Sequence, residues 1–272
     1  MLIGWILYGN NKNCNIGYKK IEGVAMSEKV FVNYVYDSCY SLAYGDYFLI
    51  FDYAEGILEI PESKHIMFFV SDKDRKSYTN EIFNLENLNS VKYVLNKNIS
   101  NLKYQDNIIF LNNDELGMRN LKKLYKKDNV YLLGGGEAIK IKSNTGEIFI
   151  RTISLDCEKI GFLIEIESLV IFFGGTVDFS KINDDVYLDL LDELEFENPD
   201  MIFLPITDLD KESFAYLDKL INDSDSQILF PTKIGDREEE SIEFKKFYKT
   251  KNTDIRTIKK ANYKIEIEIN CD

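Results

Sequence analysis

The segment that most constrains this chain is a short apolar run that stops abruptly in a polar loop. Residues 66–70 are all apolar, and the loop that follows, residues 71–78, is polar except for its last residue, Tyr78. A helical pattern begins near Thr79. A strand, a polar loop and a helix in this order place side chains at the carboxyl end of a sheet, where α/β proteins usually hold their chemistry. We therefore expect the functional site to include this loop.

The overall composition indicates a folded protein of one large domain or two small ones. The chain has 272 residues, of which 45% are hydrophobic and 13% aromatic, and this is enough to bury a sizeable core. The formal net charge is -13, so a polyanion would be repelled at long range. Nonspecific nucleic-acid binding is therefore excluded as a function class.

The cysteines and the apolar segments predict a cytoplasmic protein without a membrane span. The four cysteines, at positions 14, 39, 157 and 271, are far apart and form no Cys-x-x-Cys pair. This spacing favours reduced thiols over a disulfide framework. The apolar start, residues 1–7, is too short to span a bilayer and carries no basic leader or cleavage site. We expect neither membrane nor nucleic acid among the partners.

Residues 1–29 differ from the rest of the chain and are predicted to be an extension ahead of a single domain, residues 30–272. They are rich in Asn, Gly and Lys and show no sustained hydrophobic period. Met26 resembles a second beginning, and residues 22–24 can be encoded by a purine-rich stretch like a bacterial ribosome-binding site. We hypothesise that residues 1–25 are a mis-assigned start, which a purine-poor DNA sequence at that point would contradict.

From residue 30 the chain consists of two runs of short predicted strands, each followed by helices. The strands alternate in hydrophobicity or are continuously apolar, whereas the helical segments carry apolar residues at helical spacing. This order favours an α+β fold in which two sheets pack face to face with helices outside, a four-layer αββα sandwich. The predicted strands are 30–36, 40–44, 47–51, 66–70, 91–95, 108–111, 130–133, 138–142, 147–153, 162–166, 169–173, 201–204, 227–230, 255–258 and 263–269, and the predicted helices are 80–85, 116–127, 184–194, 212–221 and 239–247.

The glycine run at residues 134–136 is predicted to be a hairpin turn. A phosphate-binding loop has to open a helix whose N-terminus faces the phosphate. The residues after the run, 137–141, alternate as in a strand. The run therefore indicates a turn between two strands and not a nucleotide site.

The polar loop after residue 70 resembles the signature loop of the metallo-β-lactamase fold, in which a strand ends in Ser-His-x-His-x-Asp-His and a helix follows. Aligned on Ser71, the four ligand positions of that motif fall, in order, on Asp72, Asp74, Lys76 and Ser77. The frame of the loop is kept, whereas its histidines are absent.

Three later segments and two earlier residues extend the resemblance. Asp52 ends a strand that in this fold typically closes with an Asp bracing the metal loop, and Asp37 lies where related chains often carry a His. The segments at 154–165, 171–178 and 229–236 resemble those that hold the third His, the metal-bridging Asp and the last His. The resemblance implies a former metal-site cleft made of Asp52, Asp72, Asp74, Lys76, Ser77, Asp156, Thr176, Asp178, Lys233 and Asp236.

We expect no zinc and no other cofactor at these positions. A catalytic zinc typically needs three protein ligands that are His, Cys or carboxylate. The only histidine, His65, precedes the strand and is interpreted as a surface residue, while the bridging Asp is Thr176 and the last His is Lys233. Lys76 and Lys233 would repel a metal cation. We predict that these two lysines fill the former site by salt bridges to the carboxylates of Asp52, Asp72 and Asp74.

Three functions remain open. The first is a domain that has lost catalysis and binds an unknown small molecule or protein, or holds an assembly together. The second is a hydrolase in which Asp72, Asp74 and Asp178 bind Mg²⁺ or Mn²⁺ through oxygen. The third is a metal-free hydrolase with one of the two lysines as general base or Cys157 as nucleophile, although a lone cysteine is usually inert. Stoichiometric bound metal would favour the second over the first.

Overall fold

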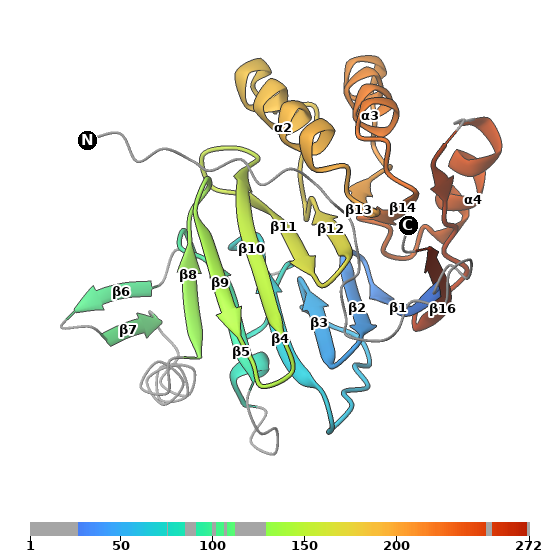
Figure 1. Ribbon diagram of the computed structural model, residues 1–272. Coiled ribbons are helices and arrows are strands. Elements are labelled where there is room, and N and C mark those ends of the chain that lie inside the picture. The colour runs from blue at the N-terminus through green and yellow to red at the C-terminus, as the bar shows by residue number, and fades with distance from the viewer. Residues whose placement is uncertain are drawn as a thin grey trace.

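Two seven-stranded mixed sheets form the centre of the protein (Figure 1). The computed structural model describes residues 27–74, 76–84, 91–99, 102–105, 108–111, 129–248 and 252–270. Across the first sheet the strands are β16 (Tyr263–Asn270), β1 (Ser27–Tyr36), β2 (Cys39–Tyr44), β3 (Tyr47–Phe51), β4 (His65–Val70), β5 (Lys92–Asn96) and β8 (Val130–Leu133). Across the second they are β15 (Asp254–Ile255), β14 (Ile228–Thr232), β13 (Met201–Pro205), β12 (Leu169–Phe173), β11 (Ile160–Ile166), β10 (Glu147–Ser154) and β9 (Ala138–Lys142).

Both sheets follow the same plan, an antiparallel half joined to a parallel half. In the first sheet β16, β1, β2 and β3 pair antiparallel, and β3, β4, β5 and β8 pair parallel. In the second sheet β9 to β12 pair antiparallel, and β12 to β15 pair parallel. In each sheet the carboxyl ends of the parallel strands meet at one edge, which is where α/β sheets usually place binding residues.

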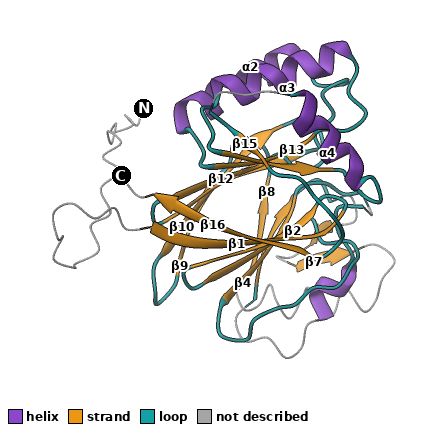
Figure 2. Cartoon of the chain, turned by 90° about the vertical axis from the view of Figure 1, so that its right-hand side faces the viewer, coloured by secondary structure: helices purple, strands orange, loops and turns teal. Residues whose placement is uncertain are grey.

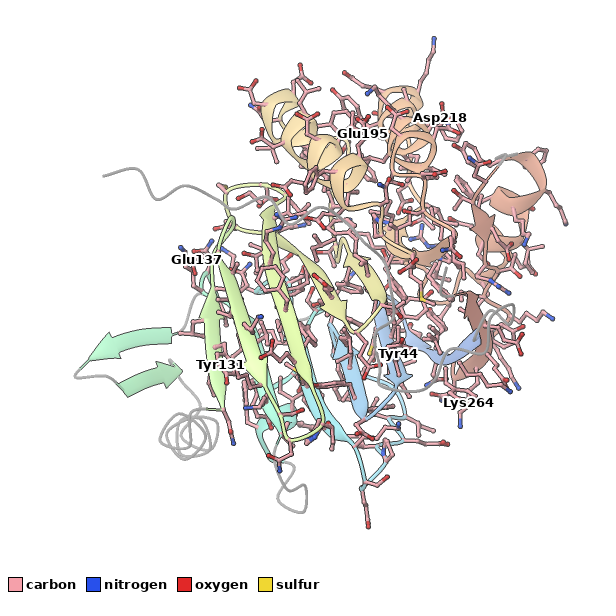
Figure 3. All side chains as sticks on the ribbon, viewed as in Figure 1. Tyr44, Tyr131, Glu137, Glu195, Asp218 and Lys264 are labelled. Atoms are coloured by element: carbon pink, nitrogen blue, oxygen red, sulfur yellow. The ribbon has the colours of Figure 1, made fainter. Side chains whose placement is uncertain are left out.

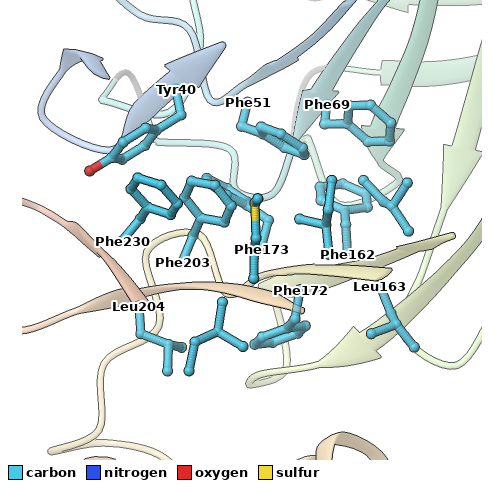
Figure 4. Close-up of a cluster of buried hydrophobic side chains, with 14 of the residues drawn as sticks. Tyr40, Phe51, Phe69, Phe162, Leu163, Phe172, Phe173, Phe203, Leu204 and Phe230 are labelled. Carbon is cyan, nitrogen blue, oxygen red and sulfur yellow. The ribbon is translucent and has the colours of Figure 1, made fainter. Parts of the chain in front are cut away.

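Aromatic side chains from both sheets form the core between them. Phe51 of β3 stacks on Phe173 of β12 with ring centroids 4.6 Å apart, and Phe203 of β13 stacks on Phe230 of β14 at 4.8 Å. Figure 4 shows Tyr40 beside these rings, and its hydroxyl donates to the Pro231 carbonyl at 2.5 Å. Because these rings are fully buried, their area accounts for much of the hydrophobic stabilisation of the sandwich.

Three helices cover the outer face of the second sheet (Figure 2). They are α2 (Asp184–Glu197), α3 (Lys211–Asp223) and α4 (Glu238–Phe247). Asn183 and Asp210 cap the first two, because each side chain accepts a hydrogen bond from a backbone N–H of the first turn. Charged side chains such as the exposed Glu195 lie on the outside of this layer (Figure 3).

The outer face of the first sheet is also apolar and is covered in part by a 3₁₀ helix, η1 (Asn80–Asn84). Phe83 packs against Tyr93 of β5, whose hydroxyl donates to the Ile82 carbonyl at 2.8 Å. A two-stranded ribbon, β6 (Leu102–Gln105) and β7 (Ile108–Leu111), stands apart from both sheets. None of the described helices is long and apolar enough to cross a membrane.

The predicted α+β sandwich is confirmed, with helices flanking two large sheets. The predicted helix at 80–85 is a 3₁₀ helix, and β6 is a strand that the sequence analysis missed. The turn at 134–136 is present but the hairpin was wrong, because β8 pairs with β5 in one sheet and β9 pairs with β10 in the other. The predicted helix at 116–127 and the hypothesised start within residues 1–26 lie outside the described residues.

Candidate functional site

Loops that follow the parallel strands of both sheets come together at one edge of the sandwich. Asp52 follows β3, Ser71 and Asp72 follow β4, and residues 174–178 follow β12. Lys233 follows β14, and a fifth loop, residues 155–159, joins β10 to β11. Hydrogen bonds connect these loops pairwise, so side chains far apart in sequence form one site.

Asp52, Ser71 and Gly175 form the first part of the site, which we call the Asp52 corner. The Asp52 carboxylate is fully buried and accepts hydrogen bonds from the Ser71 backbone N–H at 2.7 Å and the Ser71 hydroxyl at 2.6 Å. Gly175 has a φ of 54°, and a Cβ built there would lie 2.3 Å from Ser71 Oγ. The corner therefore requires glycine at this position for both its backbone conformation and its space.

Burial dominates the electrostatics of the Asp52 corner. The pKa of Asp52 is raised to about 7, chiefly by burial and to a smaller extent by the neighbouring Asp72, while the two bonds from Ser71 oppose the shift. Lys159 also lowers the pKa, as a nearby cation should. Two hydrogen bonds from Ser71 thus tie Asp52 to the loop after β4.

Asp72, Lys159, Thr176 and Lys233 form the second part, which we call the lysine cleft. The Thr176 hydroxyl donates to Asp72 Oδ2 at 3.1 Å, and Lys159 Nζ lies 3.5 Å from the same oxygen. Lys159 Nζ also donates to the Thr176 carbonyl at 3.0 Å. One ammonium group thereby ties the loop after β4 to the loop after β12, a task that resembles that of a bridging metal.

Lys159 is not among the site residues predicted from the sequence. Its position depends on Asp156, whose Oδ1 accepts the backbone N–H groups of Glu158 at 2.7 Å and Lys159 at 2.6 Å. This is the turn chemistry typical of Asp in a short loop. An Asp-x-x-Lys spacing between two strands was the available signal. Asp156 therefore acts on the site through Lys159 and not by pointing at a metal position.

Lys233 lies half-buried on the other side of the same loop. It has a left-handed backbone with φ of 58°, and its Nζ donates to the Val177 carbonyl at 2.9 Å. Burial lowers the pKa of its ammonium group, and the nearby charge of Lys159 lowers it further, whereas Asp178 and Asp37 raise it. Among the described residues no carboxylate oxygen lies within 4.0 Å of Lys233 Nζ.

The prediction that Lys76 and Lys233 form salt bridges with the carboxylates of the cleft is therefore wrong. Asp74 is exposed, and its carboxylate accepts the backbone N–H of Lys76 at 3.2 Å, so this turn directs Lys76 to the surface. Lys233 bonds a carbonyl instead of a carboxylate because its left-handed backbone brings it against the loop after β12. The cation beside Asp72 is Lys159.

The other predicted residues lie around the cleft. Asp178 accepts bonds from Ser180 at 2.7 Å and Lys181 at 2.8 Å. Burial alone would raise the pKa of Asp178, but these bonds and the charge of Lys233 lower it to about 2. Ser77 is fully buried, and its hydroxyl has no hydrogen-bond partner among the described residues.

A hollow of about 340 Å³ adjoins these loops, and Asp236, the last of the predicted site residues, lies in its lining. Its charged lining includes Asp37, Glu55, Lys76, Asp236 and Arg237. Burial raises the pKa of Asp37, while three neighbouring cations, Lys76 first among them, oppose the shift. The Arg237 guanidinium is committed to Asp208, with bonds of 3.0 and 2.9 Å.

The described residues do not fit a family-type zinc centre. No three His, Cys, Asp or Glu side chains in the described part of the chain lie close enough to hold a metal ion. Asp72, Asp74 and Asp178, the proposed oxygen ligands, each bond different partners. His65 is half-buried at the far end of β4, with its ring 5.7 Å from that of Tyr47, and Cys157 is exposed.

Comparison with solved structures identifies the architecture. A metallo-β-lactamase-fold protein from Bacillus subtilis matches with a TM-score of 0.54, covering 88% of this chain and 99% of its own at 12% identity. The chain has the metallo-β-lactamase fold. A metallo hydrolase from the archaeon Ignicoccus hospitalis matches with a TM-score of 0.54 at 10% identity, over 89% of this chain and all of its own. A possible metal-dependent hydrolase from Veillonella parvula matches with a TM-score of 0.53 at 8% identity, covering 89% of this chain and 99% of its own.

No family model and no curated protein matches the sequence. At identities of 8 to 12% the structural likeness establishes the metallo-β-lactamase fold and does not extend to an activity. The function must therefore be argued from the Asp52 corner and the lysine cleft.

Proposed function

We propose that this chain is a non-catalytic metallo-β-lactamase-fold protein whose cleft binds a small molecule or a protein. The observation that supports this most strongly is Lys159, whose ammonium group lies 3.5 Å from Asp72 and 3.0 Å from the Thr176 carbonyl. These two residues stand where the resemblance places a first metal ligand and the bridging Asp. A tethered cation thus compensates the buried carboxylate that a metal would otherwise neutralise.

Electrostatics makes the tethered cation and a divalent metal alternatives to each other. A metal bound to Asp72 at about 2 Å would lie within about 6 Å of the Lys159 ammonium. At an effective dielectric constant of about 20, the repulsion between a divalent ion and this group is about 5 kcal/mol. Repulsion of that size offsets part of the attraction between the ion and the Asp72 carboxylate, and it is absent when Lys159 alone neutralises this carboxylate. The cleft therefore keeps its charge balance without metal.

A metal-free hydrolase is the second candidate, because burial and Lys159 lower the pKa of Lys233 toward the range useful for a general base. The only described partner of Lys233 Nζ is the Val177 carbonyl, so no described nucleophile is in its reach. This argues for binding over base catalysis.

A hydrolysis screen tests the proposal. Purified full-length protein is assayed with ester, lactam and phosphodiester substrates, with and without Mg²⁺, Mn²⁺ and Zn²⁺. The matched control is Lys233→Gln, which removes the candidate base. The proposal predicts no turnover above the buffer rate in any condition. Turnover that needs an added metal would favour a carboxylate-bound metal, and metal-independent turnover lost in Lys233→Gln would favour the second candidate.

We further propose that residues 30–272 form a single domain, that residues 1–25 are a mis-assigned start, and that the protein acts in the cytoplasm. The mass of the protein purified from its natural source tests the second point. A mass that starts at Met26 supports it, whereas a mass that includes residue 1 contradicts it.

A further inference from the structure

Three lysines approach the loop that follows β12, and their charges are compensated unequally. Lys159 lies 3.5 Å from Asp72, and Lys181 lies 2.8 Å from Asp178. Lys233 alone of the three has no carboxylate within 4.0 Å among the described residues, although it is half-buried. Its single described side-chain bond is to the Val177 carbonyl at 2.9 Å.

A half-buried ammonium group without a carboxylate partner is a costly arrangement. Charges removed from water are normally paired, because desolvation otherwise disfavours the charged form. The lowered pKa of Lys233, caused first by burial and then by Lys159, is the expected sign of this cost. An ammonium group has three N–H donors, so one described bond leaves donor capacity for a ligand.

Lys159 and Lys233 both approach the loop after β12, and the charge of Lys159 acts on Lys233. Their Nζ atoms bond consecutive carbonyls, those of Thr176 and Val177. The carboxylate of Asp178, the next residue, is already occupied by Ser180 and Lys181, so it competes weakly for Lys233. We propose that Lys233, assisted by Lys159, binds the oxyanion of a small ligand, a carboxylate or a phosphate group. The inference rests on the proposed binding function and names its ligand class.

The adjoining hollow limits the rest of the ligand. Three carboxylates line it, those of Asp37, Glu55 and Asp236. Of the two cations in its lining, Arg237 is paired with Asp208, and Lys76 is exposed. A second negative group placed there would meet three carboxylates. The site therefore selects a ligand with one anionic end, and a polyanion such as pyrophosphate is disfavoured.

Calorimetric titration of the full-length protein tests the inference. Inorganic phosphate, acetate and pyrophosphate are titrated at pH 7, with ionic strength matched by chloride. The variants are Lys233→Gln, which removes the charge, and Lys233→Arg, which keeps it. Lys140→Gln is the control, because it removes one charge from the edge strand β9, where Lys140 pairs with Glu147.

Binding of phosphate or acetate should weaken by about tenfold or more in Lys233→Gln. It should stay within a few-fold of wild type in Lys233→Arg and Lys140→Gln, and pyrophosphate should bind no better than phosphate. The preferred probe decides between a phosphate and a carboxylate ligand. Equal affinity in wild type and Lys233→Gln, or no binding of any probe to wild type, would overturn the inference. Neither result bears on the proposal that the protein is non-catalytic. Only turnover in the hydrolysis screen would contradict that proposal.

Discussion

The Asp52 corner and the lysine cleft lie side by side on the same loops but differ in how they relate to the metallo-β-lactamase fold. In the corner, Asp52 bonds Ser71 and Gly175 packs on Ser71. The cleft has none of the histidine ligands, and Lys159 spans Asp72 and Thr176 instead. The corner is thus held by a glycine contact and by bonds to a buried carboxylate, whereas the cleft is held by the charge of one lysine.

Among single substitutions, the largest difference between the two regions should appear when Gly175 is changed. Gly175→Ala places a Cβ 2.3 Å from Ser71 Oγ on a backbone with φ of 54°. We expect a loss of about 3 kcal/mol of unfolding free energy, measured by denaturant. Gly136→Ala is the matched control, because Gly136 has φ of 75° and nothing within 4 Å of a built Cβ. The control should lose only about 1 kcal/mol. Similar losses at both positions would show that the corner is not tightly packed.

The pH dependence of stability should next separate the corner from the rest of the molecule. Because the folded pKa of Asp52 is raised to about 7, the folded protein holds a proton that the unfolded chain releases near pH 4. Stability should therefore fall as pH rises from about 4 to above 7, by up to about 4 kcal/mol. Asp52→Asn, which keeps the shape, should remove this fall. Parallel stability curves for wild type and Asp52→Asn over that range would contradict the raised pKa.

In the lysine cleft, removal of the Lys159 side chain should lower the free energy of unfolding by a smaller amount than the two changes in the corner. Lys159→Met leaves the Asp72 carboxylate, whose side chain is 7% exposed, without its cation. We expect a loss of about 2 kcal/mol, reduced from the fully buried case because the Lys159 side chain is 24% exposed. The double variant with Asp72→Asn should recover part of this loss. Additive losses in the double-mutant cycle would mean that the two charges do not interact.

The smallest effect should come from the pair that the sequence alone suggested. Asp74 is exposed and Lys233 bonds the Val177 carbonyl, so Asp74→Asn and Lys233→Met should act independently. We expect a coupling energy below about 0.3 kcal/mol in chemical denaturation. A coupling above about 1 kcal/mol would restore the salt bridge first predicted between these residues.

The sequence was sufficient for the fold because hydrophobic periodicity records which faces are buried. Strands such as β3 and β4 were predicted within one residue of their ends. The hairpin predicted around the turn at 134–136 was wrong because periodicity does not tell whether two successive strands share a sheet. In the site, Asp52 and Thr176 were predicted from motif position and lie where protein contacts hold them.

The identity of the cation in the cleft could not be predicted from motif position. Motif alignment assigns only residues that replace metal ligands, and it therefore selected Lys76 and Lys233. Lys159 reaches the site from the loop between β10 and β11, outside the aligned ligand positions. A charge that compensates a buried carboxylate can come from any nearby loop, so three-dimensional proximity decides it.

Zinc content after exposure to the metal tests the central claim most directly. Full-length wild type, Lys159→Met and Asp72→Asn are incubated with excess Zn²⁺, desalted, and analysed for bound metal per chain. Wild type should hold well under about 0.1 equivalents of zinc, because Lys159 already neutralises Asp72. About one equivalent or more of zinc in wild type, lost in Asp72→Asn, would contradict the account.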